Sequence, residues 1–305
     1  FTNLTFFGGV RRMCLKAPQT VENNSDGSGV FLFRRSAGAI PGRAAERGGN
    51  PGKIRIRRRL MFWEYYILFT LLILVCAIFS GWASMRVHSA YGKFGKVANA
   101  SHMTGYDTAV RLLRSNGVHD VSVGRVKGNL TDHFDPKRQV VNLSDATYGS
   151  DSVAAVAVAA HEIGHVMQRE KGYIPYKIRA AIVPVANIGS RLALPLVLVG
   201  LLLDLFIYTG SGTEWGFYLA MVGVILYGLS TLFMLVTLPV ELDASRRAKK
   251  MLLAEGILSE EEKPGASKVL SAAALTYVAS LLTSLVYFLR FLTWVLMLFG
   301  RSRRD

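Results

Sequence analysis

Residues 159–168 read Ala-Ala-His-Glu-Ile-Gly-His-Val-Met-Gln, and the core of this stretch, His161-Glu162-Ile163-Gly164-His165, decides how the rest of the chain is interpreted. Apart from the two histidines and the glutamate the stretch is uncharged, which predicts a buried helix from about Asp151 to Arg169. On a helix, residues four apart lie on one face about one turn apart, so two imidazoles can bind one ion. The spacing therefore predicts a zinc-binding helix with His161 and His165 as ligands.

Glu162 directly follows the first histidine, so it flanks the predicted metal rather than binding it. From there a carboxylate can take a proton from a metal-bound water, whose pKa zinc lowers toward neutrality. The resulting hydroxide can attack a carbonyl group, which makes Glu162 the candidate general base of a zinc-dependent hydrolysis. Gly164 weakens the helix but leaves room for a substrate or a neighbouring strand to approach.

A catalytic zinc needs a third protein ligand, and the candidate is Glu241 in the segment Pro239-Val240-Glu241-Leu242-Asp243. Two apolar runs separate Glu241 from His165, so both residues are expected on the same side of a membrane. Two alternatives stay open. Either Asp243 is the ligand, or neither acid binds the ion and Glu241 balances the arginines that follow it.

Apolar runs dominate the chain, which is 51% hydrophobic and 19% charged and so more apolar than a usual soluble protein. Four runs are long enough to span a bilayer. They cover about residues 65–85, 192–208, 215–240 and 269–299. Arg290 interrupts the fourth run, which predicts a tilted span, a hairpin or an interfacial helix there.

The segment between the first two runs predicts a small soluble domain. Thr104-Gly105-Tyr106-Asp107 opens an amphipathic helix with a capping box, and Gly117 ends it. Strand-like runs at 120–126, 130–134 and 139–143 predict a small antiparallel sheet, and the last two runs are the candidate edge strands for an extended substrate. The expected fold class is an α+β membrane protein, in which transmembrane helices accompany a small zincin-like domain that carries the HExxH helix.

The first sixty residues are rich in Gly, Arg, Asn and Ser and show no sustained apolar period. Because Met61 precedes an aromatic-rich run, residues 1–60 are interpreted as a disordered or non-native extension, with a basic leader as the alternative. The expected organisation of the rest is a transmembrane helix at 61–85, the zincin-like domain at 86–177, two transmembrane helices at 178–240, a juxtamembrane segment with the third ligand at 241–268, and a transmembrane or interfacial helix at 269–300.

The net charge of +15 gives no reason to expect a nucleic-acid partner. Residues 1–60 hold 12 Lys/Arg against 3 Asp/Glu, or +9, which leaves +6 for the other 245 residues. Excess Lys and Arg mark cytoplasmic segments, and basic residues follow both the first run and the third. We therefore expect an integral protein of a bacterial cytoplasmic membrane, with its active site on the cytoplasmic side. The basic tail 301–304 fits less well if the fourth run crosses the membrane once.

Four blocks, in order along the chain, resemble the YugP-like neutral zinc metallopeptidases of bacteria. They are residues 129–136 (Asn-Leu-Thr-Asp-His-Phe-Asp-Pro), 159–168, 238–248 (Leu-Pro-Val-Glu-Leu-Asp-Ala-Ser-Arg-Arg-Ala) and 275–279 (Leu-Thr-Tyr-Val-Ala). The resemblance implies a membrane-bound, zinc-dependent peptidase of the gluzincin kind with a Glu as third ligand. More distantly, the pattern is similar to HtpX-type and CAAX-prenyl-type membrane proteases, which place an Asp four residues after the ligand Glu. Here Ser245 stands at that position and Asp243 only two residues on, so the partner of the first histidine stays open, with Asp243 as a candidate.

These features together predict a membrane-bound zinc endopeptidase that cleaves protein or peptide substrates in or near the lipid bilayer. One alternative is an intramembrane protease of the site-two type with Asp243 as ligand, although the HExxH helix is a poor bilayer span. Another is a non-catalytic membrane scaffold, which would have no use for Glu162. His133 and Tyr277 are candidates for stabilising the oxyanion of the reaction, with purely structural roles as the alternative.

Overall fold

A computed structural model describes residues 51–207 and 215–299. Its contacts divide the chain near residue 65, and the fold described here is that of the unit beginning at Tyr66. Most of the predicted extension 1–60 lies outside the described residues, but its last part, 51–60, is helical and opens helix α1, Pro51–Phe94.

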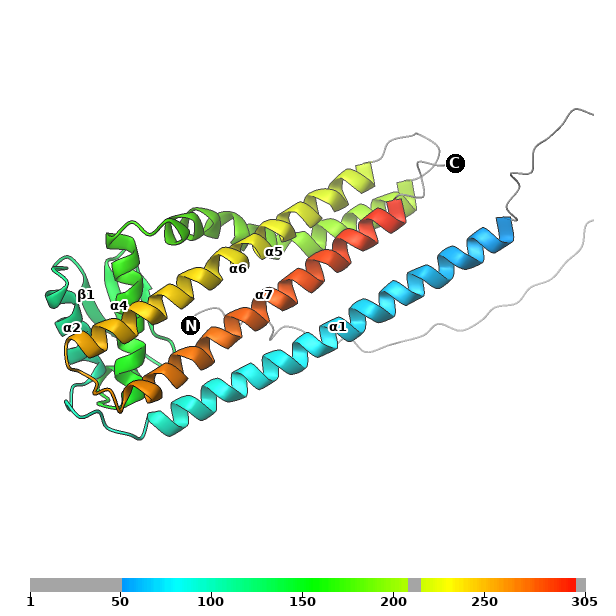
Figure 1. Cartoon of the computed structure of the whole chain (residues 1–305). Helices are drawn as coiled ribbons and strands as arrows, with labels where there is room; N and C mark the ends of the chain where they lie inside the picture. Colours follow the sequence, from blue (N-terminus) through cyan, green and yellow to red (C-terminus); the bar gives the residue numbers. More distant parts are fainter. Residues whose placement is uncertain (1–50, 208–214, 300–305) are drawn as a thin grey trace, which may run out of the picture. The chain divides into compact units, whose positions relative to one another are not determined.

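Among the described residues, four helices are long and apolar enough to cross a membrane. They are α1, α5 (Ile174–Ile207), α6 (Trp215–Ala254) and α7 (Lys263–Phe299), and their most apolar windows have a mean hydropathy between 1.8 and 2.3. About 20 apolar residues suffice to span a bilayer, so each helix extends beyond its membrane part. Helices α5, α6 and α7 run side by side (Figure 1). Glycines let α5 and α6 approach each other closely. A Cβ on Gly223 of α6 would lie 2.7 Å from the Ala193 carbonyl oxygen of α5.

The fourth apolar run forms one continuous helix through Arg290, so a hairpin is excluded there. The guanidinium of Arg290 lies 4.5 Å from the ring centroid of Trp294 and 5.4 Å from that of Tyr66. Aromatic faces attract a cation electrostatically. These contacts explain how an arginine is accommodated in an otherwise apolar helix.

The soluble part begins with α2, Gly105–Ser115, and the predicted capping box is confirmed. The Thr104 side chain accepts a hydrogen bond from the Asp107 backbone, and the Asp107 side chain accepts one from the Thr104 backbone. Gly117 follows the helix with a φ of +73°, a conformation that glycine adopts without strain. Three short strands follow: β1 (Ser122–Val126), β2 (His133–Asp135) and β3 (Val140–Ser144).

The sheet is mixed, so the expectation of an antiparallel sheet is only partly correct. Its order is β1-β3-β2, with β1 parallel and β2 antiparallel to β3. The chain leaves β1, forms β2 at the far edge and returns through a tight turn to place β3 in the centre. Because the chain reverses direction twice, once into β2 and again into β3, β3 runs the same way as β1. The predicted edge role of 139–143 is therefore wrong, whereas β2 is an edge strand.

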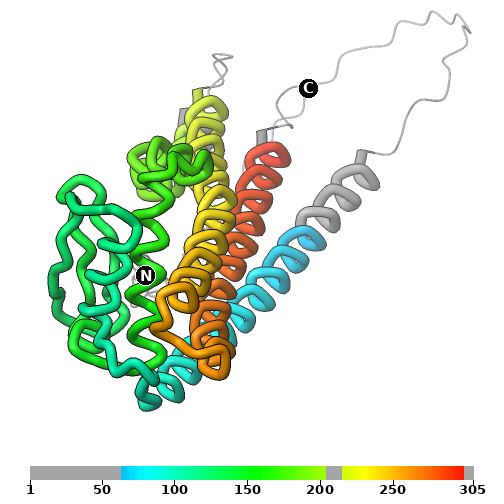
Figure 2. The backbone as a smooth tube through the Cα atoms, turned by 60° about the vertical axis from the view of Figure 1, so that its left-hand side comes forward, coloured from blue at the N-terminus to red at the C-terminus, as the bar shows by residue number. Residues whose placement is uncertain are grey.

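A short helix α3 (Asp145–Tyr148) leads from the sheet into α4 (Val153–Glu170), which is buried along Val153–Gln168. Figure 2 shows α4 between the strands on one side and α6 and α7 on the other. One apolar core fills both interfaces, and it includes Leu112 of α2, Val141 of β3, Ile163 of α4 and Leu270 of α7. The HExxH helix is thus the central element of the soluble part.

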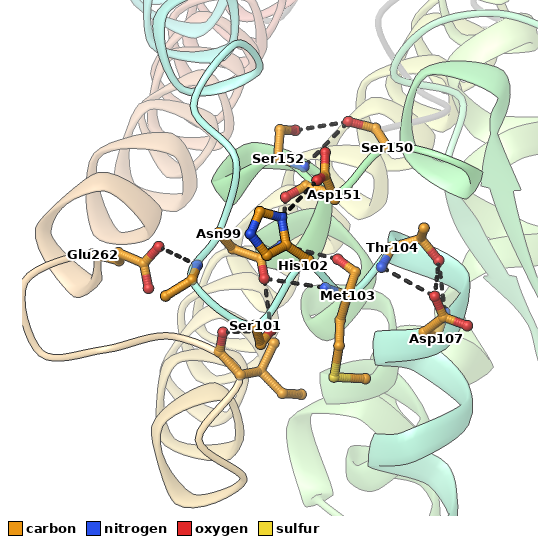
Figure 3. A network of polar contacts seen from close by, with 12 residues as sticks. Asn99, Ser101, His102, Met103, Thr104, Asp107, Ser150, Asp151, Ser152 and Glu262 are labelled. Atoms are coloured by element: carbon orange, nitrogen blue, oxygen red, sulfur yellow. Dashed lines mark hydrogen bonds and ion pairs between the residues drawn. The ribbon is translucent and has the colours of Figure 1, made fainter.

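A polar network ties the loop after α1 to the start of α4 and to the α6–α7 connection (Figure 3). The Asn99 amide donates to the Met103 carbonyl at 2.9 Å and also contacts the Asp151 carbonyl. Glu262 accepts a hydrogen bond from the Ala100 backbone at 2.8 Å, and the Ser101 hydroxyl donates to the Ile257 carbonyl at 3.0 Å. These contacts fix where α4 begins relative to the neighbouring long helices.

Candidate metal centre

Helices α4 and α6 cross at Gly164 with almost no space between their backbones. A Cβ on Gly164 would lie 2.6 Å from the Ala244 carbonyl oxygen, which is closer than real contacts allow. The room that Gly164 provides is therefore taken by helix α6, and not by a substrate or a strand. The close crossing brings the C-terminal half of α6 against the histidine face of α4.

Three side chains converge at this crossing: His161, His165 and Glu241. One ligand atom from each lies within 4.8 Å of the other two. Glu241 Oε2 is 3.2 Å from His161 Nε2 and 3.5 Å from His165 Nε2. The imidazole rings stand edge to face, with centroids 4.8 Å apart and an interplanar angle of 84°. All three residues are buried, and Glu241 is only 2% exposed.

The cluster suits zinc by its donor chemistry. Two imidazole nitrogens and one carboxylate oxygen are the ligand set of many catalytic zinc sites, which keep a fourth position for water or substrate. Their mutual distances leave space for an ion after small side-chain adjustments. Among the described residues, no other group of His, Cys, Asp and Glu side chains comes together in this way.

Glu162 lies beside the cluster without joining it. Its side chain is buried with the rest of the helix, at 3% exposure. Its charge adds to the rise in the pKa of the adjacent His165.

Each imidazole is held from behind at its other nitrogen. Ser245 Oγ lies 3.1 Å from His161 Nδ1, so the serine occupies the position for which the sequence left the partner open. Gln168 Oε1 lies 3.0 Å from His165 Nδ1. Such partners orient metal-binding histidines. In both rings the Nε2 atom is the one that faces Glu241.

Asp243 is turned away from the cluster. Its Oδ2 accepts hydrogen bonds from Gln168 Nε2 at 2.9 Å and from Arg247 Nε at 2.6 Å. Asp243 therefore contacts neither histidine directly, and it reaches His165 only through Gln168. This position is that of a supporting residue and not of a third ligand.

Helices α5 and α7 cover the free side of Glu241. Arg179 Nη1 of α5 lies 2.9 Å from Glu241 Oε1, the oxygen that does not face the histidines. The Tyr277 side chain of α7 also interacts with Glu241. The Tyr176 ring lies 6.5 Å from the His165 ring, centroid to centroid. Of these residues the sequence singled out only Tyr277, because nothing local in α5 indicates which of its faces meets Glu241.

His133 is held within the sheet. Its Nδ1 lies 2.9 Å from the Thr131 carbonyl oxygen and its Nε2 lies 3.2 Å from the Asn142 amide. Both ring nitrogens thus have partners in or beside β2 and β3. Of the two oxyanion candidates, Tyr277 is the one that interacts electrostatically with a cluster residue.

Outside the long apolar helices, His165 and Asp132 near the site have shifted pKa values. Burial lowers the pKa of His165, but the adjacent Glu241 carboxylate outweighs burial and leaves that pKa above its ordinary value. Burial raises the pKa of Asp132, against the lowering effect of the hydrogen bonds it accepts from Ser144, and the charge of Glu162 adds to the rise.

The chain is similar in sequence to a family of zinc metallopeptidases and to a named membrane protease. A family model described as "Putative neutral zinc metallopeptidase" matches residues 69–296. The chain is 44% identical, over 225 residues, to a Bacillus subtilis (strain 168) protein named "Putative membrane protease YugP". That alignment covers 74% of this chain and 95% of the relative. No solved structure matches the chain.

Proposed function

Since the chain belongs to the neutral zinc metallopeptidase family that contains the YugP-like proteins, we propose that it is a membrane-bound zinc endopeptidase of the gluzincin kind, with a zincin-like HExxH domain. In this proposal His161, His165 and Glu241 hold the ion. The observation that carries it is the meeting of both Nε2 atoms with Glu241 Oε2 across the α4–α6 crossing. A soluble helix and a helix that leaves the membrane jointly supply the ligands, so the site belongs to the membrane surface.

In the proposed reaction the zinc ion would activate the water and the carbonyl, and residues of the chain would transfer the proton. Zinc, when bound, lowers the pKa of a water molecule and polarises the scissile carbonyl. Glu162 accepts the proton of that water and passes it to the leaving amine as the peptide bond breaks. The buried position of Glu162, directly after His161 in α4, supports this role because it limits competing solvent.

Tyr277 and Arg179 are proposed to stabilise the negative charge that develops on the carbonyl oxygen. Arg179 Nη1 lies 2.9 Å from Glu241 Oε1 and Tyr277 interacts with the same carboxylate, so both would stand next to a residue that would hold the ion. A phenol and a guanidinium are hydrogen-bond donors, and donors fixed in a water-poor site stabilise an oxyanion strongly. His133, which is engaged within the sheet, fits a structural role.

The substrate is proposed to be an extended segment of a protein or peptide close to the bilayer. Strand β2 is an edge strand of a sheet that lies over α4, so an extended peptide can pair with its free side. The end of α6 carries Arg246, Arg247, Lys249 and Lys250, which favours the cytoplasmic face of a bacterial inner membrane for the site.

Two alternatives are less well supported. A site-two-type protease would need Asp243 as a ligand, but its carboxylate is engaged by Gln168 and Arg247. A non-catalytic scaffold offers no reason to keep a buried Glu162 beside the ligand His161.

The proposal is tested by purifying the protein in detergent and measuring zinc content beside cleavage of an unstructured protein such as casein. One zinc per chain is expected, with cleavage abolished by a chelator and restored by added zinc. Zinc binding without any cleavage, over a range of unfolded and membrane-derived peptides, would favour the scaffold.

A further inference from the structure

Gln168 is a fully buried polar residue at the end of the HExxH face, and every hydrogen-bonding atom of its side chain has a partner. Its Nε2 lies 2.8 Å from the Val240 carbonyl oxygen and 2.9 Å from Asp243 Oδ2. Its Oε1 lies 3.0 Å from His165 Nδ1. The side chain therefore bridges α4 and α6 directly behind a proposed zinc ligand.

The orientation of this amide follows from its partners. A backbone carbonyl can only accept a hydrogen bond. The Asp243 carboxylate is paired with Arg247, whose Nε lies 2.6 Å from the same oxygen, so it also accepts. Both acceptors require the NH₂ group of Gln168, which leaves its carbonyl oxygen facing the imidazole. The reverse orientation would set oxygen against two oxygens.

A carbonyl oxygen has no hydrogen to give, so the hydrogen of this contact must come from His165. A neutral imidazole carries one N–H, and here it must be at Nδ1. The lone pair is then at Nε2, the atom 3.5 Å from Glu241 Oε2. Ser245 differs, since a hydroxyl can donate or accept, and it does not by itself dictate the tautomer of His161.

We propose that Gln168 is a positioning residue that holds His165 as its Nδ1–H tautomer, with Asp243 and Arg247 fixing the amide from the other side. The inference rests on the proposed ligand role of His165. The tautomer, however, is a property of the metal-free protein, so it is measured without zinc, substrate or turnover. Gln168 thereby presents a ready lone pair to the ion and removes the need for tautomer exchange on binding.

The test uses metal-free, ¹⁵N-histidine-labelled protein at a pH where His165 is neutral, with its ring nitrogens assigned through a His165→Gln variant. The wild-type protein is expected to show a protonated Nδ1 and an unprotonated Nε2. Gln168→Met removes all three hydrogen bonds at similar volume and should yield a mixture of tautomers. Its zinc affinity should fall about 10–100-fold, the usual effect of losing such a partner. Gln139→Met is the matched control, since the one hydrogen bond of the exposed Gln139 side chain to a described residue is to the exposed Asp120.

An exchange of the donor end separates positioning from packing. Gln168→Glu keeps an oxygen acceptor beside His165 Nδ1 but loses the amide donor to Val240 and Asp243. The Nδ1–H tautomer should therefore persist in this variant, while zinc affinity falls because the side chain is no longer fixed from α6. Retention of a pure Nδ1–H tautomer with unchanged zinc affinity in Gln168→Met would overturn the proposal. If that variant does not fold, loss of the Nδ1–H tautomer in Gln168→Glu would overturn it equally.

Discussion

Gly164 of α4 and Ala244 of α6 meet backbone to backbone, so that a Cβ on the glycine would lie 2.6 Å from the alanine carbonyl oxygen. This contact sets the distance between the two helices that supply the proposed ligands. Any side chain at position 164 must push α6 outward and take Glu241 with it.

Gly164→Ala should therefore lower both stability and zinc affinity, although alanine is the better helix former by about 1 kcal/mol. Overpacking of this kind typically costs about 1–3 kcal/mol. Thermal unfolding and zinc titration of the purified variant measure the two effects. Gly81→Ala in α1 is the matched control, because nothing lies within 4 Å of its added Cβ. Equal behaviour of the two variants would contradict a tight crossing.

Glu241→Ala should abolish zinc binding, since two imidazoles alone hold zinc weakly. Asp243→Ala should keep the ion but bind it about 10–100-fold more weakly, because Asp243 acts through Gln168. Zinc content after dialysis against a weak chelator distinguishes the two. Loss of zinc from the Asp243 variant alone would support the site-two type of site.

Arg179→Met should reduce kcat more than it reduces zinc affinity, because Arg179 contacts the Glu241 oxygen that faces away from the histidines. A loss of about 10²–10³-fold in kcat is expected if the guanidinium also stabilises the oxyanion. Lys177→Met, which removes the same charge from an exposed position on the same helix, should leave kcat unchanged. If Arg179→Met had the same kcat as wild type, Arg179 would have only a structural role.

Asp132 should make the protein less stable as pH rises. Its folded-state pKa is raised by burial, so its stabilising contribution is complete below the unfolded value of about 3.9 and is lost as pH rises through the folded pKa. Melting temperatures of wild type should therefore fall relative to Asp132→Asn over that interval. Asp145, whose pKa is lowered first of all by its hydrogen bond with Arg125, should show the opposite trend in Asp145→Asn. A pH-independent difference for Asp132 would contradict this assignment.

The sequence predicted the parts of the site that depend on local spacing. His161 and His165 share a face because four residues make about one helical turn, and Glu241 follows from the even number of spans between it and His165. The capping box at Thr104 is likewise local.

What it did not predict depends on how separate elements meet. The parallel pairing of β1 with β3 arises from the long return of the chain through β2. The partner of Gly164 depends on the rotation of α6, and the roles of Ser245 and Gln168 depend on the same rotation. Arg179 reaches Glu241 because of the path of α5, which periodicity alone does not fix.

The measurement that most directly tests zinc-dependent hydrolysis with Glu162 as base is a comparison of zinc content and peptide cleavage in Glu162→Gln. The substitution leaves His161, His165 and Glu241 in place, so the variant should bind zinc as wild type does. Its cleavage rate should fall about 10²–10⁴-fold, because an amide cannot accept the proton. Near-full cleavage by Glu162→Gln with zinc bound would contradict the mechanism.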